Sequence, residues 1–202
     1  SVRDAKITVL RSIAPLETKD LVLGQYGAGS KAGTRHPAYR EEVAVRRDSI
    51  VPTYAACVLR VDNERWRGVP FTISAGKGLN EALSEVRIRF RTLESNIFCA
   101  TGQCPPANEL VIRIQPDEAL LLRIMNKVPG LELSLAETDL NLKYKSAFTG
   151  QIPDAYERLL LDVICGDRSL FISQDELAAA WDIFTPALRE VDGKRIAPEI
   201  YG

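Results

Sequence analysis

A row of cationic side chains in the middle of the chain is the feature with the clearest chemical potential. This cationic stripe falls mainly on predicted strands and consists of Arg87, Arg89, Arg113, Arg123 and Lys127. Planar guanidinium groups suit bidentate contacts with phosphate, so one interpretation is an anion-binding surface. The nearby acids Glu85, Glu109 and Glu118 allow a second interpretation, a surface of ion pairs, which is the default for exposed charges. The residues alone leave both interpretations open.

Cysteine and histidine are too sparse to predict a metal centre or a catalytic triad. Cys99 and Cys104 lie near one another in a loop rich in glycine and proline, but a zinc site needs further ligands. The single histidine, His36, precedes a proline and has no nucleophile and orienting acid around it in the sequence. We therefore expect no metal, an exposed His36 and a buried, inert Cys165 at a helix end.

The glycine-rich segment 27–33 is similar to a phosphate-binding loop only in composition. Its glycine spacing fits neither the dinucleotide fingerprint nor the P-loop, and no helical pattern follows to supply a positive dipole end. We interpret residues 27–40 as an exposed connection between strands.

The candidate groups are expected on the strands of an antiparallel sheet. Alternating or mostly apolar patterns predict strands at residues 6–13, 21–23, 53–61, 69–73, 86–90, 110–115 and 140–144. Because side chains alternate at period two, Leu110, Ile112 and Ile114 should face inward, and Val111 and Arg113 outward. The pattern predicts a sheet with one covered face.

Two helices are expected near the C-terminus. Apolar residues at helical spacing between positions 156 and 164 predict a helix that begins after Asp154 and ends at Gly166. Ser173 and Glu176 have the spacing of a capping box, and the helix they begin should end near Pro186. Strands followed by helices predict the α+β class, with a large, mainly antiparallel sheet and helices packed on one face.

Length and composition narrow the class of protein. The 202 residues carry 26 Lys+Arg and 27 Asp+Glu, and 46% are hydrophobic, which is typical of a folded chain without charge excess. No apolar run is long enough to span a bilayer, and four scattered cysteines favour a reducing compartment. We expect a single domain at 1–202, a cytoplasmic location, and neither nucleic acid nor membrane as partner. Because the chain starts at Ser1, we expect it to be processed or part of a longer protein.

Six ordered stretches carry a family resemblance. They are LGQY at 23–26, DNERWRGVPF at 62–71, AGK at 75–77, NELVIRIQP at 108–116, DAYERL at 154–159, and DEL at 175–177 with AW at 180–181. In order and spacing, these stretches resemble the C-terminal domain of glucose-6-phosphate dehydrogenase from about Lys6 to Gly202.

The resemblance implies an α+β domain that completes a sugar-phosphate pocket and forms a homodimer or tetramer through its sheet. It also implies an N-terminal NADP-binding Rossmann domain, absent from this chain, that holds the coenzyme site and the catalytic base. The implied activity of the full enzyme is NADP-dependent oxidation of glucose-6-phosphate to 6-phosphogluconolactone in the pentose phosphate pathway. This chain alone is then expected to contain no catalytic residue and to be inactive. The alternative is an inert stand-alone assembly or regulatory protein derived from that domain.

The resemblance also implies binding residues. Lys77 matches a lysine that reaches the sugar phosphate, Gln115 a glutamine that hydrogen-bonds the substrate, and Tyr156 a tyrosine near the phosphate end of the pocket. A second, structural NADP found in some members would lie at Arg87, Arg113, Arg123 and Lys127. Four positions depart from members that hold this nucleotide: Ser74, Leu83, Leu121 and Asn141.

Overall fold

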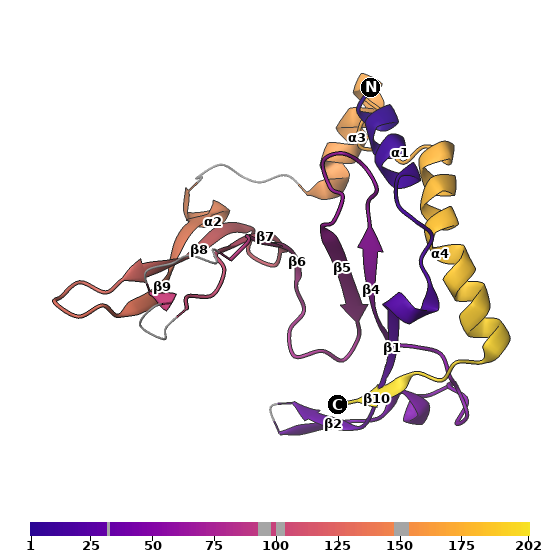
Figure 1. The fold of residues 1–202 in the computed structure, drawn as a ribbon. Coiled ribbons are helices and arrows are strands. Elements are labelled where there is room, and N and C mark those ends of the chain that lie inside the picture. Colours follow the sequence, from indigo (N-terminus) through magenta and orange to yellow (C-terminus); the bar gives the residue numbers. More distant parts are fainter. Residues whose placement is uncertain (32, 93–97, 100–103, 148–153) are drawn as a thin grey trace. The chain divides into compact units, whose positions relative to one another are not determined.

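The chain divides into two compact units in a computed structural model (Figure 1), which describes residues 1–31, 33–92, 98–99, 104–147 and 154–202. The first unit comprises Ser1–Leu79 and Asp154–Gly202, and the second comprises Asn80–Pro153. Each unit is described by itself below.

The first unit is a four-stranded sheet with helices, in the strand order β10-β1-β4-β5. Strand β10 pairs parallel with β1, and the other neighbours are antiparallel. Its elements are α1 (Val2–Arg11), η1 (Thr18–Asp20), β1 (Leu21–Tyr26), β2 (Gly29–Lys31), β3 (Thr34–His36), η2 (Tyr39–Glu41), β4 (Tyr54–Arg60), β5 (Pro70–Gly76), α3 (Ala155–Cys165), α4 (Gln174–Lys194) and β10 (Glu199–Tyr201).

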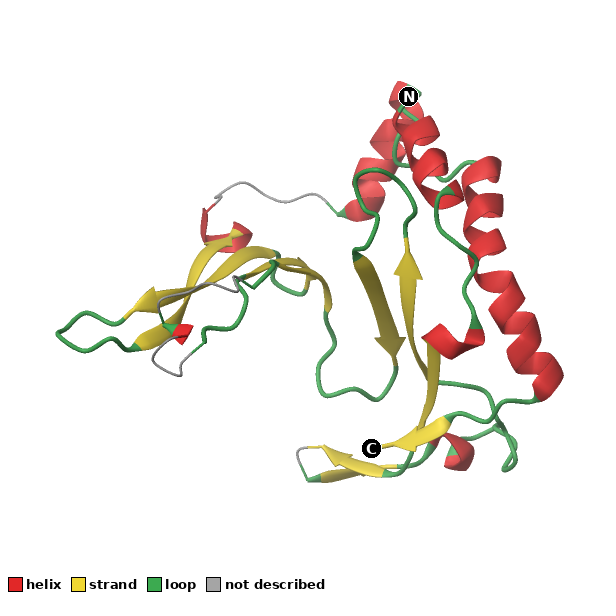
Figure 2. Cartoon of the chain, in the orientation of Figure 1, coloured by secondary structure: helices red, strands yellow, loops and turns green. Residues whose placement is uncertain are grey.

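The core of the first unit lies between the sheet and α4. Ile183 and Ala187 of α4 are buried against Cys57 and Leu59 of β4, with Leu16 closing the cluster. Figure 2 shows α4 running along the strands. Removal of this apolar surface from water provides the main free energy that holds helix and sheet together.

Residues 6–13 were predicted as a strand, and this is wrong: α1 covers Val2–Arg11. The helix begins with a capping box, in which the Ser1 hydroxyl accepts from the Asp4 amide at 3.3 Å and the Asp4 carboxylate accepts from the Ser1 amine at 3.0 Å. Leu10 and Ile13 then pack against the core cluster. The half-buried residues of α1 are Arg3, Lys6, Ile7 and Leu10, which have helical spacing, whereas Val9 is exposed.

The helix after Ser173 was predicted to end near Pro186, and this is also wrong, because α4 continues to Lys194. The predicted capping box is confirmed in its first half, since the Ser173 hydroxyl accepts from the Glu176 amide at 3.2 Å. The Glu176 carboxylate instead pairs with the Lys6 ammonium at 2.8 Å. A proline within a helix costs about 3 kcal/mol. The buried residues Ile183 and Ala187 stand on either side of Pro186, and their packing on the sheet offsets this cost.

Helix α3 begins and ends where the sequence predicted. The Asp154 carboxylate caps the first turn by accepting from the Tyr156 amide at 2.8 Å, and Gly166 ends the helix in the left-handed region at φ 72°. Cys165, expected to be buried, is exposed.

The second unit is a four-stranded antiparallel sheet in the order β6-β7-β8-β9. Its elements are β6 (Ser84–Arg89), β7 (Glu109–Gln115), β8 (Ala119–Lys127), β9 (Leu135–Lys143) and the short α2 (Tyr144–Ala147). The α+β class is confirmed, with the strands divided between two four-stranded sheets and one β2–β3 pair among the described residues. Strand β8 escaped prediction because its run of leucines does not alternate.

The two faces of the second-unit sheet are the reverse of the predicted ones. Val111, expected to face outward, is only 1% exposed, whereas Ile114, Leu140 and Leu142, expected to face inward, are exposed. Alternation identified which residues share a face. It could not identify the buried face, because a network of ion pairs surrounds Val111 on its own side.

Candidate functional site

Lys77 stands directly after β5 with both of its backbone polar groups hydrogen-bonded. Its N–H donates to the carbonyl oxygen of Thr53 at 2.9 Å, and its carbonyl oxygen accepts from the Tyr201 hydroxyl at 2.7 Å. The side chain itself is exposed. A fixed backbone with a flexible ammonium stem is suited to capturing an anion.

The glycines on either side of Lys77 are required by their surroundings. A Cβ on Gly76 would lie 2.6 Å from Cδ2 of Tyr54, closer than side-chain carbons approach. Gly78 has φ 62°, a backbone conformation that favours glycine, and it lies over the ring of Tyr26. The turn that presents Lys77 therefore depends on both glycines.

Gln25, in the centre of the LGQY stretch, is buried and fully hydrogen-bonded. Its amide donates to the carbonyl oxygens of Ser49 at 3.1 Å and Val51 at 2.9 Å, and accepts from Nε of Arg40 at 2.9 Å. These bonds tie the segment between η2 and β4 to β1. Sequence reasoning assigned no role to Gln25, and only its place in a family motif could have drawn attention to it.

Gln115 and Tyr156 occupy exposed positions at the ends of elements. Gln115 is the last residue of β7 in the second unit, where it pairs with Ser84 of β6. Tyr156 lies in the first turn of α3 in the first unit, and its side chain is 77% exposed. Both side chains are thus available to a ligand, and Tyr156 is not buried as its place on an apolar stripe would suggest.

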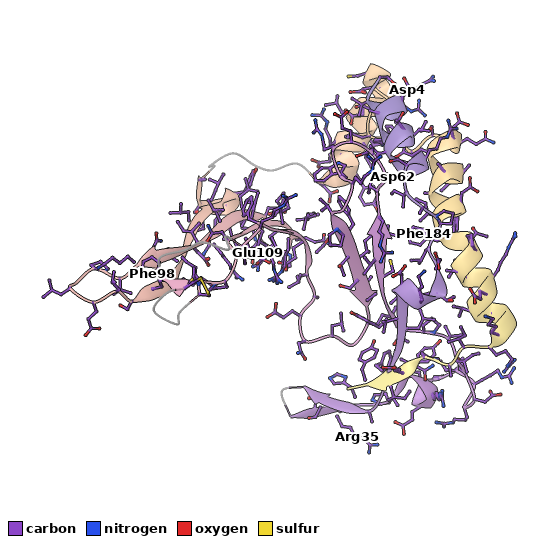
Figure 3. All side chains as sticks on the ribbon, viewed as in Figure 1. Asp4, Arg35, Asp62, Phe98, Glu109 and Phe184 are labelled. Carbon is purple, nitrogen blue, oxygen red and sulfur yellow. A yellow bond between two sulfur atoms is a disulfide. The ribbon has the colours of Figure 1, made fainter. Side chains whose placement is uncertain are left out.

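Three of the four arginines of the cationic stripe, Arg87, Arg113 and Arg123, pair with acids of the same sheet. Arg87 contacts Glu85 and lies 3.5 Å from Glu109, whose other neighbour is Arg123 at 3.7 Å. Figure 3 labels Glu109 among the side chains of this sheet. For these three arginines the geometry matches the ion-pair interpretation.

Two further contacts complete the network. Arg113 lies 3.8 Å from Glu85, and Arg123 lies 3.5 Å from Asp139, an acid that sequence reasoning did not single out. Lys127 takes no part in these pairs, because its ammonium donates to the carbonyl oxygens of Val128 at 3.0 Å and Gly130 at 2.7 Å.

This pairing bears on the structural NADP that the resemblance implies at four of these cations. Within the network three arginines face three acids and their charges cancel, so a phosphate there would have to compete with the ion pairs. Lys127 lies outside this balance. The assignment of Arg87, Arg113, Arg123 and Lys127 to a structural NADP stays a prediction.

A hollow of about 450 Å³ lies at one end of the same sheet. Its charges also balance, and the Lys145 ammonium bonded to Asp117 holds the pKa of that carboxyl below its ordinary value of 3.8. Of the four predicted nucleotide residues the hollow includes Arg113 alone, and its lining is Arg113, Asp117, Glu118, Ala119, Leu121, Asp139, Asn141, Lys143, Lys145 and Ser146.

The other candidates from the sequence have structural explanations. Cys99 and Cys104 are joined by a disulfide, which explains their proximity and differs from the reduced cysteines expected. His36 is exposed on the β2–β3 hairpin, paired with Gly29, and the hairpin occupies the glycine-rich segment. Within the described ranges we find no cluster of metal-binding side chains and no helix that could cross a membrane.

Comparison with known proteins decides the family. The family model for the glucose-6-phosphate dehydrogenase C-terminal domain matches residues 1–202. The chain belongs to this family.

Relatives of the glucose-6-phosphate dehydrogenase family extend well beyond the matched region. The chain is 51% identical to the chloroplastic glucose-6-phosphate 1-dehydrogenase of Solanum tuberosum over 203 residues, which is 99% of this chain and 35% of that protein. The chain is 46% identical to the glucose-6-phosphate 1-dehydrogenase of Drosophila melanogaster over 204 residues, which is 99% of this chain and 38% of that protein. The chain therefore spans little more than a third of these relatives.

Solved structures of the family have the same fold. A glucose-6-phosphate dehydrogenase in complex with its substrate glucose-6-phosphate matches with a TM-score of 0.88 and 42% identity, over 99% of this chain and 40% of that one. The enzyme from Mycobacterium avium matches with a TM-score of 0.75 and 30% identity, over 98% and 39% of the two chains. The family is one of nicotinamide-dependent oxidoreductases.

Proposed function

We propose that this chain is the substrate-binding and subunit-contact part of a glucose-6-phosphate dehydrogenase. The full enzyme would oxidise glucose-6-phosphate to 6-phosphogluconolactone in the pentose phosphate pathway. The observation that carries the proposal is Lys77, an exposed ammonium on a backbone anchored at both its N–H and its carbonyl. The solved relative in complex with glucose-6-phosphate supports the choice of substrate.

The proposed roles of the residues follow from their chemistry. The Lys77 ammonium would bind the phosphate, and the Gln115 amide would donate to one sugar oxygen and accept from a hydroxyl. The Tyr156 hydroxyl would bind near the phosphate end. Contacts of this kind would orient the C1 hydrogen for transfer, and NADP supplies the hydride acceptor when bound. The base and the coenzyme site would lie on the rest of the intact polypeptide.

Exposed apolar residues on α3 support the presence of a covering domain. Leu160, Val163 and Ile164 are all exposed, Ile164 to 83%. A helix this apolar on its surface is stable when buried against another part of the protein. The proposed N-terminal coenzyme domain would provide that cover.

The exposed apolar face of the second-unit sheet supports subunit contact. It includes Val86, Ile88, Ile114, Leu140 and Leu142. Apolar patches of this kind mark interaction surfaces. We propose that a homodimer or tetramer forms through this face. The cytoplasmic location also stays a proposal, and the name of the potato relative places that protein in the chloroplast.

Substitution of Lys77 in the full-length enzyme tests the proposal. Lys77→Ala should raise KM for glucose-6-phosphate about ten- to hundredfold, the equivalent of one charge-assisted contact, and leave KM for NADP unchanged. Lys19→Ala is the matched control, because Lys19 is an exposed lysine of the same unit paired with Glu17. An unchanged KM for glucose-6-phosphate in Lys77→Ala would remove this residue from the site. The 202-residue chain alone should not reduce NADP.

A further inference from the structure

Tyr201 brings the C-terminal strand to the backbone of Lys77, 124 residues away in the sequence. Its hydroxyl lies 2.7 Å from the Lys77 carbonyl oxygen and 3.0 Å from Oγ1 of Thr53. The Tyr201 carbonyl oxygen accepts from the Gly27 amide at 2.6 Å, so the backbone of this residue is held as well.

The ring of Tyr201 is located by packing on two sides. It lies so close to Gly24 that a Cβ there would be 2.8 Å from Cδ1 of Tyr201. On another side it meets the ring of Tyr54 edge to face, with 5.7 Å between ring centroids. Because the ring is fixed, the direction of the hydroxyl is fixed too.

The protons of this cluster follow one direction. Tyr201 has a single hydroxyl proton, which it donates to Lys77, so Thr53 must donate to Tyr201. The Thr53 hydroxyl in turn accepts from the Tyr26 amide at 2.9 Å. A continuous chain of hydrogen bonds thus runs from β1 through Thr53 and Tyr201 to Lys77, and such chains strengthen their members.

We propose that Tyr201 is a positioning residue for Lys77, which holds the lysine backbone so that its ammonium meets the substrate phosphate. The inference rests on the proposed role of Lys77. Thr53 holds the Lys77 N–H and Tyr201 holds its carbonyl, so the segment that carries the lysine is fixed before the substrate arrives. Ordering a flexible residue costs conformational entropy, and a preorganised lysine avoids that cost on binding.

Tyr201→Phe in the full-length enzyme tests this role, because it keeps the ring and removes only the hydroxyl. We expect KM for glucose-6-phosphate to rise about five- to tenfold, with kcat and KM for NADP unchanged. Amide hydrogen exchange at Lys77 should become faster. Tyr39→Phe is the matched control, a hydroxyl removed from the same unit at a ring that packs on Tyr26, and it should change none of these quantities.

A double-mutant cycle separates positioning from general stability. In the Lys77→Ala background, Tyr201→Phe should have no further effect on KM, because the group through which it acts is gone. Equal effects of Tyr201→Phe in both backgrounds would overturn the inference. An unchanged KM in Tyr201→Phe, beside a raised KM in Lys77→Ala, would overturn the inference and leave the proposed function intact. An unchanged KM in Lys77→Ala would overturn both.

Discussion

Replacement of Gln25 by leucine tests how the first unit holds the segment that leads to its candidate site. The side chain is 1% exposed and makes hydrogen bonds with Ser49, Val51 and Arg40. Leucine nearly preserves the volume and removes all three bonds, each worth about 1 kcal/mol net. Arg40 keeps a second bond to the Ser49 carbonyl oxygen at 3.0 Å, which limits the loss. We expect the free energy of unfolding to fall by about 3 kcal/mol.

Urea unfolding of the chain, followed by far-ultraviolet circular dichroism, measures this loss. The midpoint should move to lower urea with an unchanged slope, which shows that stability rather than compactness has changed. The matched control is Gln174→Leu, an exposed glutamine at the start of α4, which should change stability by less than about 0.5 kcal/mol. A loss below about 1 kcal/mol for Gln25→Leu would refute the view that this buried amide stabilises the fold.

Three further predictions concern charge and burial. Arg60 donates two hydrogen bonds to the Asp20 carboxylate and holds the pKa of that carboxyl below its ordinary value of 3.8. The pair therefore stabilises the fold above pH 3.8, and this stabilisation is lost as the pH falls through the lowered pKa. Asp20→Asn should therefore flatten the decline of the urea midpoint in acid; an unaltered decline would contradict this. Glu109→Gln should destabilise the second unit by about 1–3 kcal/mol, because the Glu109 carboxylate is only 13% exposed and its loss leaves Arg87 and Arg123 without this charged partner. Faster amide hydrogen exchange in β7 and β8 would show the loss of stability. Burial raises the pKa of the Cys57 thiol, so alkylation followed by mass spectrometry should label Cys57 only after unfolding.

Local signals in the sequence predicted much of the secondary structure. The Asp154 and Ser173 caps and the glycine at 166 identified the starts of both late helices and the end of one. These signals are reliable because a cap satisfies backbone groups within its own turn. The end of α4 was predicted wrongly because the helix continues past Pro186 only through its packing against β4, and no local sequence pattern contains that packing.

The candidate site could be predicted only in part for the same reason. The family motif identified Lys77, and its exposed position after β5 is consistent with binding. Nothing near Tyr201 in the sequence marks its hydroxyl as a partner of Lys77, since that contact depends on the parallel pairing of β10 with β1. Alternation correctly grouped Val111 with the cations on one face of the second-unit sheet, but it assigned the opposite face to the interior. The face of Val111 is buried because Glu85 and Glu109 pair there with arginines of separate strands, which alternation along one strand does not reveal.

Three separate stretches of sequence meet in one arrangement around Lys77. Gly24 must lack a side chain because a Cβ there would come within 2.8 Å of the ring of Tyr201. The amide of Tyr26, two residues later, begins the hydrogen-bond chain that passes through Thr53 and ends at the Lys77 carbonyl. One hydrogen-bond chain therefore connects the LGQY stretch, the AGK stretch and strand β10. A substitution in any of the three should change the position of the Lys77 ammonium.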